Sequence, residues 1–149
     1  MKNFDQLKCV DFHTHPVTAG FRAAVSSLGI DPIAEDGFPL PDWSVQDQLA
    51  FMQEADIDFS VLSAPAPHLY NGDAVKAKEA ARKVNDEIAG IVQAYPDRFA
   101  FVGCVPLPDV EGALAETAYA MDTLGAAGMK AATNIGGIYL GDPRFDPLM

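Results

Sequence analysis

The chain has 149 residues, the length of a single domain, and its 49% hydrophobic and 21% charged residues are typical of a globular protein that buries a core. A net charge of −11 argues against nucleic acid and anionic membrane surfaces as partners. The first residues contain no apolar signal core and no run approaches transmembrane length, so a cytoplasmic location is expected.

The N-terminal third is predicted to contain one strand and two helices. Residues 8–13 form an apolar run typical of a buried strand, and residues 21–28 fit a short amphipathic helix. The stretch 29–41 is rich in glycine and proline and is predicted to be a loop. Ser44 is a suitable N-cap for the second helix, with Asp47 three residues later. The apolar face of that helix is formed by Leu49, Phe51, Met52 and Ala55.

The remaining chain continues the alternation of strands and helices. Strands are predicted at residues 57–63, 99–105 and 129–133, and helices at residues 73–95 and 110–124. Three strand–helix units followed by a strand predict a parallel sheet with right-handed crossovers. The nearly continuous apolar strands fit a sheet that is covered on both faces.

The C-terminal residues resemble the beginning of another structural unit. Asp146 followed by Pro147 is the pattern of an N-cap and a first helical residue, but the sequence leaves no room for that helix. Gly136 and Gly137 form a loop that lacks the spacing of a phosphate-binding loop.

The most informative feature is a pair of histidines, His13 and His15, at the end of the first predicted strand. Side chains alternate along a strand, so the two imidazoles face the same way, with their Cα atoms about 6.6 Å apart. That arrangement suits two ligands that converge on one metal ion at about 2.0–2.1 Å each. Pro16 ends regular pairing and places the pair at the strand's C-terminal tip, while Asp11 on the same face is a candidate for orienting an imidazole.

Further polar residues are expected at the same end of the sheet. His68 follows the second predicted strand and is a candidate for substrate contact or for a third metal ligand. Asn134 lies at the tip of the fourth strand and is a second candidate for substrate binding, whereas Lys130 at its start is interpreted as structural or solvated. Cys9 and Cys104 lie in apolar strand-like stretches, which predicts buried free thiols.

A series of motifs runs through the whole chain in a fixed order. They occupy residues 11–15, 62–65, 84–86, 95–99, 105–108 and 123–147. With these motifs the chain resembles the amidohydrolase superfamily, and within it the branch of aminocarboxymuconate-semialdehyde decarboxylase and related aromatic-acid decarboxylases. Each motif alone is weakly specific, whereas the ordered series is strongly specific.

The resemblance implies an α/β fold that is the N-terminal half, about four βα units, of a TIM-type (β/α)₈ barrel. Residues 1–149 would form a single amidohydrolase-related domain, truncated before strand 5. A full barrel typically needs about 250 residues. In the family a divalent metal, usually zinc, sits at the C-terminal mouth, and His13 and His15 would be two of its ligands. The further histidine and aspartate ligands and a catalytic histidine would lie in the absent half, so the metal is expected to bind weakly.

The reaction implied by the resemblance is the non-oxidative decarboxylation of a small aromatic or unsaturated carboxylic acid. The first alternative is metal-dependent hydrolysis of a C–N or lactone bond. The second is a catalytically inactive half-barrel that only associates or binds metal. The first and fourth strands would be open edges, so self-association or pairing with a complementary half is also expected.

Overall fold

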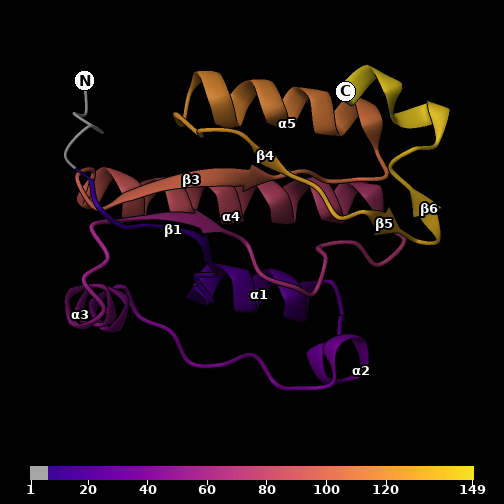
Figure 1. The fold of residues 1–149 in the computed structure, drawn as a ribbon. Coiled ribbons are helices and arrows are strands. Elements are labelled where there is room, and N and C mark those ends of the chain that lie inside the picture. Colours follow the sequence, from indigo (N-terminus) through magenta and orange to yellow (C-terminus); the bar gives the residue numbers. More distant parts are fainter. Residues whose placement is uncertain (1–6) are drawn as a thin grey trace.

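The structure, a computed structural model, describes residues 7–149, including all side chains except those of residues 35 and 36. Its centre is a four-stranded parallel sheet in the order β1-β2-β3-β4 (Figure 1). The strands are β1 Val10–Thr14, β2 Phe59–Ser63, β3 Phe99–Cys104 and β4 Met129–Lys130. The predicted parallel order is therefore confirmed, and β1 and β4 form the two edges.

Helices follow the strands and pack beside one another. The α-helices of the described residues are α1 Ala19–Ser27, α2 Pro32–Asp36, α3 Val45–Glu54, α4 Ala74–Ala94 and α5 Val110–Asp122. The long helix α4 packs on β3 and contacts α1 on one side and α5 on the other (Figure 1). None of the described helices has the length and apolar character needed to cross a membrane.

The core lies between this helical layer and the sheet. Leu62 of β2 and Phe101 of β3 are register partners, and both are fully buried. They belong to one apolar cluster with Phe21 of α1 and with Val84 and Ile88 of α4. The apolar face predicted for the long helix therefore packs against the sheet.

Two short helices were not predicted from the sequence, one within residues 29–41 and one at the C-terminus. The predicted loop 29–41 contains α2, which begins where the Asp31 carboxylate accepts the Ile33 N–H and Pro32 occupies the first turn. At the C-terminus, Asp142 rather than Asp146 caps the last turn, a 3₁₀ helix at Pro143–Leu148. In both places an aspartate–proline pair marks the start of the turn.

The predicted fourth strand at 129–133 is shorter than expected. It ends at Lys130, and the chain then forms an antiparallel hairpin of β5 Asn134–Ile135 and β6 Ile138–Tyr139. Gly136 and Gly137 connect them with φ angles of 58° and 82°, a backbone that two-residue hairpin loops require and that glycine adopts freely.

One family-like motif fastens the N-terminal ends of the central strands. Arg98, just before β3, donates from Nε to the Asp58 carbonyl at 3.1 Å and from Nη2 to the Ile57 carbonyl at 3.1 Å. Both carbonyls lie just before β2, at the sheet end opposite to the histidine pair. This arginine therefore stabilises the sheet and lies away from the candidate site.

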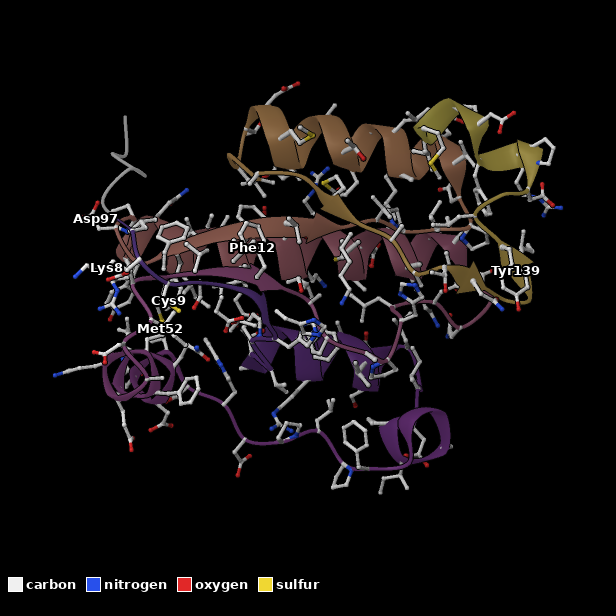
Figure 2. All side chains as sticks on the ribbon, viewed as in Figure 1. Lys8, Cys9, Phe12, Met52, Asp97 and Tyr139 are labelled. Carbon is white, nitrogen blue, oxygen red and sulfur yellow. The ribbon has the colours of Figure 1, made fainter. Side chains whose placement is uncertain are left out.

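Apolar side chains remain exposed at both sides of the structure. Phe12 on the edge strand β1 is 76% exposed (Figure 2), and its neighbour Val10 is exposed as well. On α5, the last long helix, Leu114 and Met121 are exposed on one face, two turns apart. These exposed apolar side chains fit the expectation that the sheet of a half-barrel has open edges.

Candidate metal and substrate site

The two histidine rings lie next to each other at the C-terminal end of β1. Their ring centroids are 4.7 Å apart and the ring planes are 74° from parallel. Between Asp11, which pairs with Ser60, and Thr14, which pairs with Leu62, β1 has one residue more than β2. Such a bulge locally re-aims side chains and is common at barrel rims and beside active sites.

His15 is held by the end of β2. Its Nδ1 lies 3.0 Å from the Ser63 carbonyl oxygen and 3.1 Å from the Ser63 hydroxyl oxygen. With the proton on Nδ1, the ring donates to the carbonyl and turns the lone pair of Nε2 away from β2, the usual arrangement of a metal-ligating histidine. Desolvation by burial lowers the pKa of His15, which favours the neutral ring that metals bind.

Asp11 supports the pair through the backbone instead of through a ring. Its carboxylate accepts the His13 backbone N–H at 2.8 Å and the Thr14 hydroxyl. The Thr14 hydrogen bond, followed by that of His13, lowers the pKa of Asp11 and keeps it ionised. The expectation that Asp11 orients an imidazole directly is therefore replaced by a role in shaping the bulge.

The histidines alone do not complete a metal site. Within residues 7–149, no group of three or more His, Cys, Asp or Glu side chains is placed to hold a metal ion. His68 therefore does not join His13 and His15 as a third ligand. Catalytic zinc sites usually have three protein ligands, so the donors present here fit part of such a site.

A cavity of about 660 Å³ opens at the same end of the sheet, beyond β2, β3 and β4. Its wall is formed by the segment 64–72 after β2, by Cys104 and Val105 at the end of β3, and by Lys130 and the hairpin residues Asn134 to Gly136. Both residues predicted to bind substrate, His68 and Asn134, line this cavity.

The two predicted substrate residues differ in how they are held. Desolvation, and then the charge of Lys130, lowers the pKa of His68, which favours a neutral ring at the cavity wall. The Asn134 side-chain oxygen accepts the Gly137 N–H at 2.9 Å and so closes the hairpin. Its NH₂ group is the part of the amide that remains for a ligand.

Lys130, interpreted from the sequence as structural or solvated at the start of its strand, lies in the cavity wall. Its ammonium donates to the Ala64 carbonyl oxygen at 2.7 Å. Because β4 ends at Lys130, this residue occupies the C-terminal tip of the strand, where the chemistry of parallel sheets gathers. The strand was predicted to continue to residue 133, which would have placed Lys130 near its start. Because the strand is shorter, Lys130 lies at its end.

The two cysteines have different environments. The Cys104 thiol donates to the Ala81 carbonyl and the Asn85 side-chain oxygen, and burial raises its pKa to about 12, so it is a poor nucleophile. Cys9 is exposed, so the prediction that both thiols are buried was wrong for it. Cys9 precedes the edge strand β1, which has a neighbouring strand on one side only.

The sequence matches known proteins along almost its whole length. A family model described as amidohydrolase matches residues 10–149. The chain is 32% identical over 144 residues to the 6-methylsalicylic acid decarboxylase of Penicillium expansum, covering 93% of this chain and 43% of that enzyme. It is 29% identical over 107 residues to the 2-amino-3-carboxymuconate-6-semialdehyde decarboxylase of Dictyostelium discoideum, covering 71% of this chain and 30% of that enzyme. The chain thus spans less than half the length of these relatives.

Solved structures are likewise matched over less than half of their length. The crystal structure of an amidohydrolase II superposes with a TM-score of 0.85 and 32% identity, covering 93% of this chain and 45% of that chain. The dihydroxybenzoic acid decarboxylase of Polaromonas sp. JS666, with bound manganese and the inhibitor 2-nitroresorcinol, superposes with a TM-score of 0.64 and 26% identity. That match covers 81% of this chain and 37% of that chain.

Proposed function

Because the chain belongs to the amidohydrolase family, we propose that it carries the first half of the active site of a metal-dependent, non-oxidative decarboxylase of small aromatic carboxylic acids. One observation carries the proposal. His13 and His15 lie with ring centroids 4.7 Å apart, at the same end of the sheet as the cavity, in a chain that is 32% identical to a decarboxylase.

The fold is the N-terminal half of a TIM-type barrel, with its strands parallel and its helices alternating with them. We place the active site at the C-terminal ends of the strands, the mouth of such a barrel. On this proposal residues 1–149 belong to one amidohydrolase-related domain and supply its first four strands, and the domain acts in the cytoplasm. The remaining metal ligands would come from the other half of the barrel.

The residues of this chain would divide the work as follows. His13 and His15 would hold a divalent metal, which supplies Lewis-acid stabilisation of negative charge on the substrate. The Ser63 carbonyl fixes the orientation of the His15 ring. His68 and Asn134 would contact the substrate in the cavity that both residues line.

Decarboxylation is favoured over hydrolysis of a C–N or lactone bond. The same metal ligands serve both reactions, so the fold does not choose between them. The relatives that share about a third of the residues are decarboxylases by name, including the 6-methylsalicylic acid decarboxylase. Manganese is bound in the related Polaromonas enzyme, so manganese is a candidate beside zinc.

The test is release of carbon dioxide from 6-methylsalicylate and 2,6-dihydroxybenzoate, with Mn²⁺ or Zn²⁺ added. The purified chain is assayed alone and mixed with the C-terminal half of the Penicillium expansum enzyme. We expect metal-dependent carbon dioxide release that disappears in His13→Ala. Metal-free, inert protein under both conditions would contradict the assignment for this chain.

A second candidate role, pairing with a complementary half-barrel without catalysis by the chain itself, is favoured by the exposed apolar side chains. Phe12 on the edge strand and Leu114 and Met121 on α5 would be covered by neighbours in a closed barrel.

We therefore expect the purified chain to associate, and we expect Phe12→Ser to weaken this association. Analytical ultracentrifugation over a range of concentrations measures the effect, with the exposed Val75 on α4 replaced by serine as the matched control. A chain that stays monomeric at every concentration would count against the pairing role.

A further inference from the structure

The cavity wall has an unusual charge for this protein. The whole chain has 21 acidic and 10 basic residues, yet the described residues that line the cavity include no aspartate and no glutamate. Lys130 is the single lysine or arginine among them. An acidic protein thus presents a positive, carboxylate-free cavity beside its candidate metal site. An anionic ligand would meet the charge of Lys130 there and no repelling carboxylate.

The contacts of Lys130 leave it free to bind. Its side chain reaches from β4 across β3 to the residue after β2, a span of about 9–10 Å between those strands. Of the three N–H donors of the ammonium, one is used by the Ala64 carbonyl. Within the described part of the chain Lys130 makes no ion pair, so its charge is not neutralised there.

Lys130 also lies close to the histidine pair. The Ser63 carbonyl accepts from His15, and the next carbonyl along the chain, that of Ala64, accepts from Lys130. Successive Cα atoms are about 3.8 Å apart, so the imidazole and the ammonium flank the same end of β2. Ala64 and Lys130 line the cavity, whereas the histidine pair lies beside it and does not belong to its described lining.

We propose that Lys130 is the group in this cavity that binds the carboxylate of a small aromatic acid. The choice of an aromatic acid rests on the function proposed above. A charge-assisted hydrogen bond from the ammonium gives strength and selectivity for an anion, while Tyr70 and Ile135 in the same wall offer surface to the ring. Desolvation lowers the pKa of Lys130, and a bound carboxylate offsets this cost.

The test measures binding without turnover. The purified chain is titrated with salicylate in the presence of EDTA, and with salicylamide, which has the same ring but no charge. We expect Lys130→Met to weaken salicylate binding at least about tenfold and to leave salicylamide binding unchanged. Lys130→Arg keeps the charge and should retain most of the affinity. Lys83→Met, at an exposed position on α4, is the matched control.

Two results would overturn the proposal: salicylate affinity of a folded Lys130→Met within twofold of the unaltered chain, or no salicylate binding by the unaltered chain at its highest soluble concentration. Circular dichroism and Tm establish that the variants fold. Because EDTA removes metal and no reaction is followed, the result is independent of the decarboxylase assignment. Salicylate bound through Lys130, together with no carbon dioxide release in the separate assay with added metal, would retain this subsite and reject the proposed reaction.

Discussion

Replacing Arg82 with methionine is expected to lower the free energy of unfolding by about 3 kcal/mol, the low end of the range for removing one partner of a buried ion pair, because Glu116 is fully buried while Arg82 is partly exposed. Glu116 on α5 is 0% exposed, and its carboxylate accepts from Arg82 Nε at 2.8 Å and from Asn85 Nδ2 at 2.9 Å. Without the guanidinium, the carboxylate remains buried without its counter-charge. The guanidinium also lies 3.6 Å from the centroid of the Tyr119 ring, and that contact is lost too.

The reverse change should cost less. Arg82 is 38% exposed, so in Glu116→Leu the guanidinium can turn to water. The double variant Arg82→Met/Glu116→Leu should recover most of the loss, because it removes both charges from the interface. Urea unfolding of the four proteins measures the cycle, with exposed Glu79→Ala as the control within about 0.5 kcal/mol. Equal losses in the two single variants would refute the asymmetry.

The same network explains one motif that the sequence could not interpret. Asn85 donates from Nδ2 to the Cys104 carbonyl at 3.0 Å and accepts the Cys104 N–H at 2.8 Å, so it pairs with both backbone groups at the end of β3. Arg98 does comparable work at the opposite end of the sheet. The family-like motifs around Asn85 and Arg98 therefore hold strands in place, whereas the motifs at residues 11–15, 62–65 and 123–147 supply residues of the site.

The fold was predictable wherever the apolar pattern is long and its ends are capped. Ser44 caps α3 by accepting the Asp47 N–H, as expected. The long helix α4 runs from Ala74 to Ala94, within one residue of the predicted range 73–95 at each end. The two-residue β4 was not predictable in the same way. A strand of two residues has no periodicity to detect, and its apolar continuation gave no sign of where it ends.

The candidate site was predictable in part for a related reason. His13 and His15 are close in sequence, so strand geometry alone brought them together. The approach of Lys130 to Ala64 joins residues 66 positions apart and depends on the crossover that places β4 beside β3. A contact of that kind follows from strand order and strand length together, and the second of these was misjudged.

His15→Ala is expected to lower the affinity of the chain for Mn²⁺ or Zn²⁺ at least about a hundredfold. Loss of a residue that merely orients a ligand costs about 10–100-fold, and loss of a ligand should cost no less. His13→Ala should have a similar effect, because two donors on adjacent rings bind an ion far more weakly when either is removed.

His68→Ala is the informative control for this experiment. His68 lines the cavity but does not form a three-ligand group with the pair, so metal affinity should stay within about twofold while salicylate binding weakens. Isothermal titration with each metal, at a pH where the imidazoles are neutral, measures all three variants. An equal loss of metal affinity in His68→Ala would show that the loop after β2 moves to supply a third ligand, and a chain whose metal affinity is indifferent to His13 and His15 would remove the site from the end of β1.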